Sequence, residues 1–443
     1  MSTPGLNETH DPARRSWVAL ANESGTDFPI QNLPFGIFRR LGSTDPGRGG
    51  VAIGDAILDI AACAPLFEGA ARAAAQACGA NTLQPLAELG ADAWSALRLA
   101  LSRLLDAANL NARSSAEHLL TPQAAAELLL PFRITGFTDF FASINHATNA
   151  GRMFRPDQPL LPNYKFVPIA YQGRSSTFRV SGSAIQRPRG QIKLPDSPIP
   201  LRKPSGNLDY ELELGMFIGK ESAIGEPISI DRAAQHIFGF CLLNDWSARD
   251  IQAWEYQPLG PFLAKSFATT ISPWIVTEEA LRPYRTNAFV RPPGDPAPLP
   301  YLDDATDQAI GALDITMEAY LRSKEMARRQ IAPLRLSQSS AASLYWTVAQ
   351  MVTHQTSNGC NLEIGDIIGS GTISGESEGS FGSLLEITRR GQTPLQLPTS
   401  EQRAFLEDSD EVIFRGFCDR AGFARIGFGT CAGTIYPARE ETR

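Results

Sequence analysis

Short apolar runs, each bounded by glycine, proline, asparagine or aspartate, recur from Pro131 to the end of the chain. Such runs are typical of β-strands separated by turns, so most of this region is predicted to be β-structure. Before Pro131 the apolar residues mostly follow helical spacing. At 443 residues the chain is longer than most single domains. We therefore predict two domains, residues 1–130 and 131–443, in a protein that is mainly β with some α.

The first domain is predicted to combine a small β unit with helices. The run VAIGDAILDI (51–60) places two apolar segments around a Gly54-Asp55 turn, which is a hairpin signal. Elsewhere, helical spacing of apolar residues predicts helices at 65–80, 86–110, 121–130 and 341–356.

Composition and motifs narrow the class of partner. A formal net charge of −7 argues against binding to nucleic acid or to an anionic membrane, so the expected partner is a small molecule. No GxGxxG follows a predicted strand, GxxxxGK[ST] is absent, and no GxSxG elbow appears between a predicted strand and a predicted helix, which disfavours nucleotide and serine-hydrolase functions. The six cysteines include no CxxC pair, as expected of reduced thiols. No apolar run approaches the roughly 18 residues of a membrane span, and we expect a cytoplasmic protein.

The run NDWSARDIQAWEYQPLGPFLAKSFATT (244–270) concentrates polar chemistry. It is predicted to begin with a helix of about three turns, capped by Asn244 and ended by Pro258. Helical spacing places one stripe of polar side chains on that helix: Asp245, Arg249, Gln252 and Tyr256. A solvent-exposed face with a weak Asp245 to Arg249 pair is the alternative interpretation.

Lys265, later in the same run, lies among phenylalanines. A strand over this segment would place Lys265, Phe267 and Thr269 on one face. A lysine in apolar surroundings usually needs an anionic partner or a ligand. Lys265 is therefore a candidate functional residue.

The alternating run LDYELEL (208–214) predicts a strand with Glu211 and Glu213 on one face and leucines facing a core. Adjacent carboxylates repel each other unless a cation lies between them, and an all-oxygen ligand set favours Ca²⁺ or Mg²⁺. Asp139 and Asp245 are further acidic candidates. An exposed, charged strand edge is the alternative, because sequence spacing does not show whether these carboxylates converge.

His146 has the most polar surroundings of the five histidines. A histidine that acts as a general base needs an orienting partner, and Glu386 in the run FGSLLEI is a candidate for that carboxylate. A purely structural histidine is the alternative.

These segments together resemble the fumarylacetoacetate hydrolase family. The matching runs are TDFFASINHATNAGRMFR, YQGRSSTFRVSG, LDYELELGMF, NDWSARDIQAWEYQPLGPFLAKSFATT, NGCNLEIGDIIGSGTISG and GFGTCAG. The resemblance extends over nearly the whole chain from about Asp27, since FPIQNLPFGIF and VAIGDAILD match as well. It implies an SH3-like N-terminal barrel with a helical extension, a C-terminal β-rich catalytic domain (a mixed β-sandwich roll) and a homodimer.

The resemblance also implies roles for individual residues. The implied metal ligands are Asp139, Glu211, Glu213 and Asp245, with Lys265 and Thr269 in the metal shell. His146 would be the base that activates water, oriented by Glu386. The groups that would stabilise charge on the departing product are Arg249, Gln252 and Lys265. The positions associated with substrate are Phe141, Arg155, Tyr171, Tyr256 and Thr372.

The implied reaction is hydrolysis of the carbon–carbon bond of 4-fumarylacetoacetate to fumarate and acetoacetate, the last step of tyrosine and phenylalanine degradation through homogentisate. The implied cofactor is Ca²⁺ or Mg²⁺. A related acylpyruvate or diketo-acid hydrolase, decarboxylase or hydratase is the alternative within the superfamily. A non-catalytic, metal-dependent protein that binds organic acids is the alternative outside it.

The sequence departs from the family pattern near the expected site. Phe141 stands where the family has a tyrosine, which removes a hydroxyl whose hydrogen bond is worth about 0.5–1.5 kcal/mol. Ala264 and Ala268 replace glycines beside Lys265, and Gln172 replaces a histidine. The implied metal and catalytic positions are all retained, which favours an active enzyme.

Overall fold

Two antiparallel strands, β13 (Leu212–Ile218) and β14 (Ile237–Asp245), are buried along their whole length. The computed structural model describes residues 5–440 of the chain. Around these two strands the sheet order is β7-β6-β22-β13-β14-β16-β8, with β17 beside β14. The added strands are β6 (Phe137–Phe140), β7 (Ala170–Gln172), β8 (Phe178–Val180), β16 (Thr269–Ile271), β17 (Val276–Thr277) and β22 (Ile367–Gly369).

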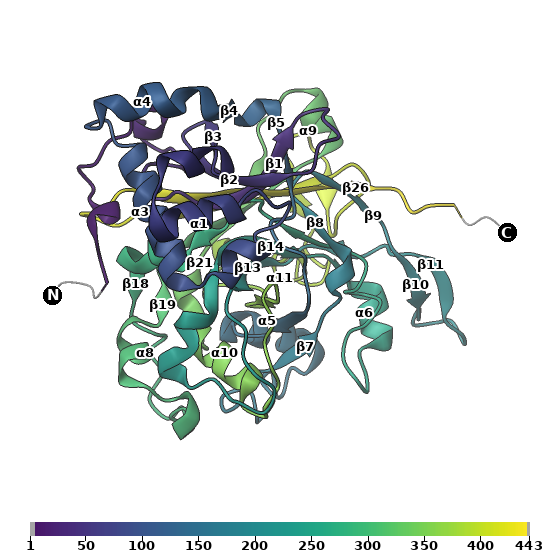
Figure 1. Ribbon diagram of the computed structural model, residues 1–443. Helices are drawn as coiled ribbons and strands as arrows, with labels where there is room; N and C mark the ends of the chain where they lie inside the picture. The colour runs from purple at the N-terminus through teal and green to yellow at the C-terminus, as the bar shows by residue number, and fades with distance from the viewer. Residues whose placement is uncertain (1–4, 441–443) are drawn as a thin grey trace.

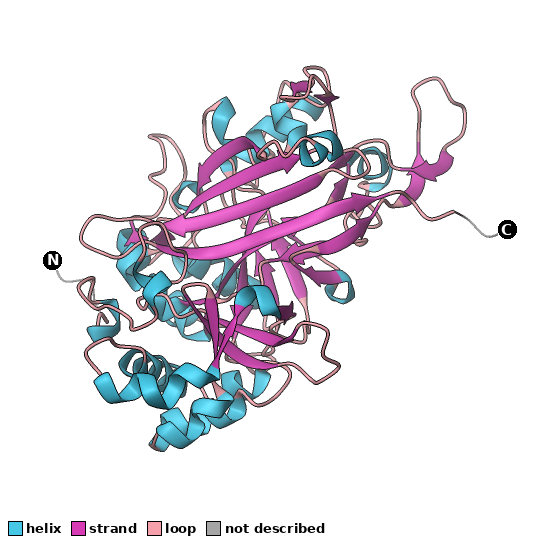
Figure 2. Cartoon of the chain, turned by 90° about the horizontal axis from the view of Figure 1, so that it is seen from above, coloured by secondary structure: helices cyan, strands magenta, loops and turns pink. Residues whose placement is uncertain are grey.

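A second sheet, of order β21-β20-β25-β26-β9, packs on one face of the first and is seen broadside in Figure 2. Leu214 and Met216 of β13 share one hydrophobic cluster with Met317 and Phe414 of this second sheet. The apolar side chains between the sheets therefore form the main core. The strands of the second sheet are β9 (Ser183–Gln186), β20 (Thr316–Arg322), β21 (Leu334–Ser340), β25 (Glu411–Cys418) and β26 (Ile426–Tyr436).

The N-terminal part of the chain covers the opposite face of β13 and β14 (Figure 1). Phe217, which alternates with Met216 along β13, stacks on Phe132 with ring centroids 5.0 Å apart. Phe238 packs edge-on against Trp94 at 4.9 Å. The described residues of this part contain the sheet β4-β3-β2-β1-β5 and four α-helices, besides short 3-10 turns. Their bounds are β1 (Phe35–Arg40), β2 (Arg48–Ile53), β3 (Ala56–Asp59), β4 (Leu120–Pro122), β5 (Ala126–Leu129), α1 (Gly69–Ala77), α2 (Gln84–Glu88), α3 (Ala91–Leu104) and α4 (Leu110–Ala116).

The remaining elements surround the two large sheets. The helices are α5 (Ile144–Phe154), α6 (Arg249–Glu255), α7 (Glu278–Leu281), α8 (Ala305–Ile310), α9 (Lys324–Arg328), α10 (Val348–Thr356) and α11 (Leu384–Ile387). The paired strands are β10 (Arg189–Ile192) with β11 (Leu201–Pro204), β12 (Leu208–Asp209) with β15 (Ser247–Ala248), β18 (Arg285–Thr286) with β19 (Ala312–Leu313), and β23 (Leu395–Gln396) with β24 (Gln402–Arg403). The β10–β11 hairpin projects from the body (Figures 1 and 2). Among the described residues, no helix has the length and apolar character needed to cross a bilayer.

The predicted fold class is confirmed, with an N-terminal β-sheet unit that carries helices and a larger C-terminal β-rich unit. The hairpin at 51–60 is also confirmed, because Ile53 of β2 pairs with Ala56 of β3. The boundary after residue 130 stays a prediction, since one hydrophobic cluster includes apolar residues from both sides of it.

The helix predicted at 121–130 is wrong. This segment forms β4 and β5, because its backbone pairs with β3 and β1 at the two edges of the N-terminal sheet. The helix predicted at 341–356 is shorter than expected. It begins at Val348, where Thr347 caps it and Gln350 completes a capping box.

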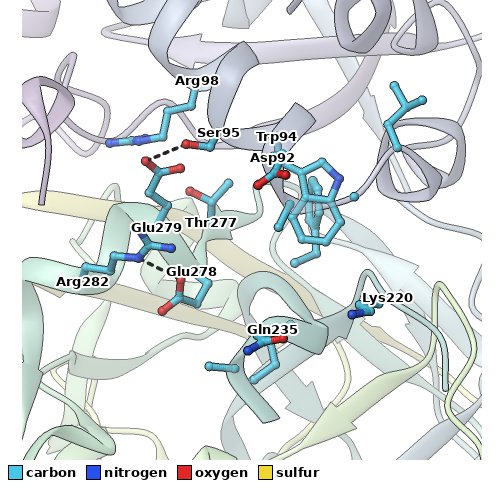
Figure 3. A pocket seen from close by; sticks show the side chains of 16 residues that line it. Asp92, Trp94, Ser95, Arg98, Lys220, Gln235, Thr277, Glu278, Glu279 and Arg282 are labelled. Carbon is cyan, nitrogen blue, oxygen red and sulfur yellow. Dashed lines mark hydrogen bonds and ion pairs between the residues drawn. The ribbon is translucent and has the colours of Figure 1, made fainter. Parts of the chain in front are cut away.

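A cavity of about 650 Å³ lies between α3 and the segment around α7 (Figure 3). Among its lining residues, Ser95 donates to Glu279 (3.2 Å) and Arg282 donates to Glu278 (3.2 Å). None of the residues selected from the sequence for their chemistry lines this cavity. Most of those residues gather elsewhere, at one end of the central sheet.

Candidate active site and metal centre

Four carboxylates converge at the ends of the central strands. They belong to Asp139 of β6, Glu211 just before β13, Glu213 of β13 and Asp245 at the end of β14, and one oxygen of each lies within 4.8 Å of the others. All four side chains are buried. The exposed strand edge considered for Glu211 and Glu213 is therefore wrong. The structure brings together the four acidic residues that the sequence suggested.

Gly369 of β22 provides the room for this cluster. β22 lies between β6 and β13, and Gly369 is the register partner of Asp139 on one side and Gly215 on the other. A Cβ at Gly369 would overlap the Asp139 carboxylate and lie 3.1 Å from Oε2 of Glu213. Gly369 is not among the residues predicted from the sequence, although the glycine-rich run GDIIGSG (365–371) indicates close approach to the backbone.

The chemistry of the cluster fits a divalent cation. Both carboxylate oxygens of Glu213 are buried, and no described residue donates a hydrogen bond to them. Burial and the nearby charge of Asp139 raise the pKa of Glu213 well above its ordinary value. Burial and Asp245 do the same to the pKa of Asp139. A hard cation would offset this repulsion, and a set of carboxylate oxygens suits Ca²⁺ or Mg²⁺.

Two cations of the chain balance part of the negative charge. Lys265 Nζ lies 2.5 Å from Oε2 of Glu211 and 2.7 Å from Oδ2 of Asp245. Arg249 Nη1 lies 2.8 Å from Oε1 of Glu211. Burial alone would raise the pKa of Glu211, but Lys265 and Arg249 lower it below its ordinary value. Burial alone would lower the pKa of Lys265, but Asp245 and Glu211 raise it, so the ammonium stays charged.

Asp245 is also held by two hydroxyl groups. The Tyr171 hydroxyl donates to Oδ2 at 2.6 Å, and the Thr269 hydroxyl donates to Oδ1 at 3.3 Å. Thr269 lies on β16 directly opposite Asp245 of β14. Both residues, which the sequence assigned to the substrate and metal surroundings, thus contact a carboxylate of the cluster.

His146 and Glu386 form a buried pair beside the cluster. Nδ1 of His146 lies 2.7 Å from Oε2 of Glu386. A short loop after β6 leads to α5, whose capping residue Ser143 accepts a hydrogen bond from the His146 backbone at 3.3 Å. Three further side chains donate to Glu386: Asn149 (2.9 Å), Ser374 (2.8 Å) and Ser383 (2.9 Å). Burial raises the pKa of Glu386, but the charge and hydrogen bond of His146 and the hydrogen bonds from Asn149 and Ser374 lower it below its ordinary value.

The helix predicted from Asn244 is wrong in its first turn. Asn244 and Asp245 end β14, because they pair with β13 and β16, and the helix α6 begins only at Arg249. The Asn244 side chain accepts a hydrogen bond from the Glu211 backbone (3.2 Å) and caps no helix. Asp245 and Arg249 therefore share no helix face, and their proposed surface pair is absent because both are buried near other partners.

Lys265 also differs from its predicted position. It lies in a turn, where its backbone N–H donates to the carbonyl of Phe262 at 3.2 Å, and the strand begins only at Thr269. The ammonium reaches the carboxylates from this turn. The expectation of an anionic partner for Lys265 is confirmed, although the predicted strand is not.

The residues associated with substrate divide into two groups. Phe141 packs edge-on against the His146 ring at 5.4 Å, and the buried hydroxyl of Thr372 has no partner among the described residues. Gln252 accepts a hydrogen bond from Arg249 Nη1 at 3.2 Å. Arg155 and Tyr256 are exposed, and their described side-chain contacts do not reach the cluster.

Comparisons with known proteins agree with this arrangement. Residues 136–436 match the family model described as Fumarylacetoacetate (FAA) hydrolase C-terminal, and residues 31–131 match Fumarylacetoacetase N-terminal. The fumarylacetoacetase of Rattus norvegicus is 44% identical over 428 residues, which cover 96% of this chain and 99% of the relative. That of Bos taurus is 45% identical over 428 residues, with the same coverage.

A solved structure, a fumarylacetoacetate hydrolase from psychrophilic Exiguobacterium antarcticum, shares the fold at a TM-score of 0.50. It is 16% identical and covers 92% of this chain and 100% of its own. The chain is an enzyme that belongs to the fumarylacetoacetate hydrolase family.

Proposed function

We propose that the chain hydrolyses the carbon–carbon bond of 4-fumarylacetoacetate to give fumarate and acetoacetate. The observation that carries this proposal is the His146–Glu386 pair, 2.7 Å apart, beside a buried cluster of four carboxylates. The relatives of 44–45% identity are fumarylacetoacetases, and they match almost the whole chain. Hydrolysis of this carbon–carbon bond is the last step of tyrosine and phenylalanine degradation through homogentisate, and we propose that role for the chain.

The cluster of Asp139, Glu211, Glu213 and Asp245 would hold one Ca²⁺ or Mg²⁺ ion. When bound, such an ion supplies Lewis acidity toward the oxygens of a 1,3-dicarbonyl substrate. Lys265 and Thr269 support the ligands through their hydrogen bonds to Asp245. Lys265 and Arg249 balance only part of the negative charge of the four carboxylates, and the remaining charge favours binding of a cation.

His146 would take a proton from the attacking water. With the proton of the neutral imidazole on Nδ1, this nitrogen donates to Oε2 of Glu386 and leaves Nε2 free to act as the base. The carboxylate fixes the ring orientation and stabilises the imidazolium that forms. Positioned base catalysis of this kind contributes about 10²- to 10⁴-fold in rate.

The water oxygen would then bond to the fumaryl-side carbonyl carbon while a negative charge develops on the carbonyl oxygen. Arg249 Nη2 is buried and has no partner among the described residues, so it can donate to a substrate oxygen. When the carbon–carbon bond breaks, its electron pair leaves with acetoacetate as an enolate. His146 Nε2 would then transfer its proton to that carbanion, which completes the reaction. Lys265 and Gln252 would stabilise the negative charge on the departing acetoacetate.

We also propose that the chain works as a cytoplasmic homodimer. Large apolar side chains are exposed on the projecting β10–β11 hairpin and on the loop after α6, including Ile199 (65%), Leu259 (97%) and Phe262 (69%). The two segments belong to neighbouring elements, since Trp254 of α6 donates to Gln191 of β10 (3.3 Å). Exposed apolar groups on neighbouring elements favour association with another protein surface, here a second copy of the chain. The six cysteines are all free thiols, which suits a reducing compartment.

The test follows the loss of ultraviolet absorbance of fumarylacetoacetate in native enzyme, chelated enzyme and chelated enzyme resupplied with Ca²⁺ or Mg²⁺. Chromatography identifies the products. We expect metal-restored conversion to fumarate and acetoacetate, and loss of at least about 10²-fold in kcat for His146→Ala with metal binding retained. His236→Ala is the control, because His236 is buried against the Lys220 carbonyl away from the cluster. A near-native kcat for His146→Ala, or a different product, would contradict the proposal.

A further inference from the structure

Asp209 is a fully buried carboxylate that lies two positions before Glu211 but does not belong to the carboxylate cluster. It ends β12, which pairs with β15 just ahead of α6. Four donors surround its two oxygens. They are Arg249 Nε (2.9 Å) and the Leu385 N–H (3.0 Å) on Oδ2, and the Leu384 N–H (2.8 Å) and the Tyr210 N–H (2.8 Å) on Oδ1.

On one side, Asp209 orients Arg249. The guanidinium is planar, so a bond at Nε and a bond from Nη1 to Glu211 together fix the plane. Fixing the plane sets the direction of the remaining nitrogen, Nη2, which is buried and unpaired. Nη2 is the nitrogen that donates to a substrate oxygen in the proposed function.

On the other side, Asp209 holds the first turn of α11. The N–H groups of Leu384 and Leu385 lie at the start of this short helix, where helix geometry leaves them without partners of their own. The next residue is Glu386, whose carboxylate faces His146. Asp209 therefore bonds the segment that places Glu386 as well as the side chain of Arg249.

No other described side chain bonds both Arg249 and the first turn of α11. Arg249 Nε and the two N–H groups are buried, and each would lose its acceptor if Asp209 were removed. A shift of α11 would move Glu386 away from Nδ1 of His146, and a rotation of the guanidinium would turn Nη2 away from the substrate.

We propose that Asp209 is a positioning residue that holds the Arg249 side chain and helix α11, which carries Glu386, in one fixed arrangement. In this arrangement Arg249 Nη2 and the His146–Glu386 pair face the same bound substrate. This inference rests on the proposed function, which gives Arg249 and Glu386 their roles. Asp209 acts through these two residues and touches no reacting atom.

The main test uses Asp209→Asn, which preserves size and one acceptor oxygen but places an NH₂ group against the donors. We expect kcat/KM to fall at least about tenfold, with both a higher KM from the Arg249 side and a lower kcat from the Glu386 side. Metal affinity measured by calorimetry should stay within about threefold of native, because Asp209 is not in the cluster. A loss of metal binding would overturn the proposal.

The matched control is Asp410→Asn. Asp410 is also buried, pairs with Arg403 Nε (2.8 Å) and accepts the Glu407 N–H (2.8 Å), but it lies outside the site. We expect this variant to lower the melting temperature to a similar extent and to leave kcat, KM and the pH profile unchanged. If Asp209→Asn behaves like Asp410→Asn, Asp209 is only structural and the inference is wrong.

Double-mutant cycles separate positioning from general damage. Glu386→Gln and Arg249→Gln should each cost at least about fivefold less in kcat/KM when introduced into Asp209→Asn than into the native chain. The acid limb of the kcat/KM profile should also move in the same direction in Asp209→Asn as in Glu386→Gln. Additive costs, within about twofold, would overturn the inference.

A further variant keeps the test decisive if Asp209→Asn does not fold. Arg249→Lys removes the Nε donor that bonds Asp209. Its effect on kcat/KM should be non-additive with that of Glu386→Gln, although Arg249 and Glu386 share no bond. The two possible failures remain distinguishable. If Glu386→Gln and Arg249→Gln alone leave turnover unchanged, the proposed function is wrong, whereas if they impair turnover without coupling to Asp209, only this inference is wrong.

Discussion

Gly369 and Asp139 are register partners on the parallel strands β22 and β6, and a methyl group on Gly369 would overlap the Asp139 carboxylate. The close approach exists because β22 passes between two strands that each present an acidic side chain on the same face. A glycine there leaves the space between Asp139 and Glu213 open to an ion.

Gly369→Ala should weaken divalent-cation binding by at least about tenfold, because the new methyl group displaces one carboxylate from the cluster. Calorimetric titration of the chelated protein with Ca²⁺ and with Mg²⁺ measures this. Gly379→Ala is the control, since a Cβ at Gly379 meets no atom within 4 Å. Native affinity in Gly369→Ala would show that the cluster does not hold the ion.

Glu213→Gln should have opposite effects on metal affinity and on the stability of the metal-free protein. Affinity should fall at least about tenfold because a ligand charge is lost. In chelator the free energy of unfolding should rise, because the substitution removes a buried carboxyl group whose charged form has no hydrogen-bond donor. Denaturant unfolding in chelator measures the second effect.

Glu318→Gln is the control for this pair of effects. Glu318 is also buried, but it is paired with Arg335 (2.9 Å) and accepts the Tyr320 hydroxyl (2.8 Å) in the second sheet. Its substitution should lower stability and leave metal affinity unchanged. A Glu213→Gln protein that is destabilised in chelator would argue against an uncompensated charge.

Phe141→Tyr should restore the hydroxyl that the family pattern has beside the base. The Phe141 ring lies edge-on to His146 and is only half-buried, so a hydroxyl has room to reach a bound substrate. We expect kcat/KM to rise by about two- to twelvefold, the equivalent of one hydrogen bond of about 0.5–1.5 kcal/mol. Phe289→Tyr, a half-buried ring that packs on Tyr345, is the control and should leave kinetics unchanged. No gain in Phe141→Tyr would mean that the pocket has adapted to phenylalanine.

Asp307 should make the stability of the fold depend on pH. Burial raises the pKa of Asp307 from 3.8 to about 6 in the folded chain. The resulting stabilisation is fully present below the unfolded pKa of 3.8 and is lost as the pH rises through about 6. Asp307→Asn stays neutral, so its free energy of unfolding relative to native should rise by up to about 3 kcal/mol between about pH 4 and about pH 7.5. Urea unfolding at both pH values measures this. The exposed Asp303→Asn controls for loss of one charge, and a constant difference for Asp307→Asn would contradict the prediction.

Local patterns in the sequence determined much of the molecule. The alternation of LDYELEL correctly placed Leu212 and Leu214 in the core, and the turn at Gly54-Asp55 correctly placed the first hairpin. These features depend on neighbouring residues, whose side-chain directions follow from the backbone period. The family resemblance indicated which acidic residues and which histidine to examine.

Only the tertiary structure decided how these residues meet. Asn244 is a good helix cap by type, but pairing of β14 with β13 and β16 keeps it in a strand, because the many ladder hydrogen bonds outweigh one cap. Residues 121–130 became strands for the same reason. The approach of Glu386 to His146 and the gap at Gly369 arise from contacts between segments far apart in the chain, which no local period encodes.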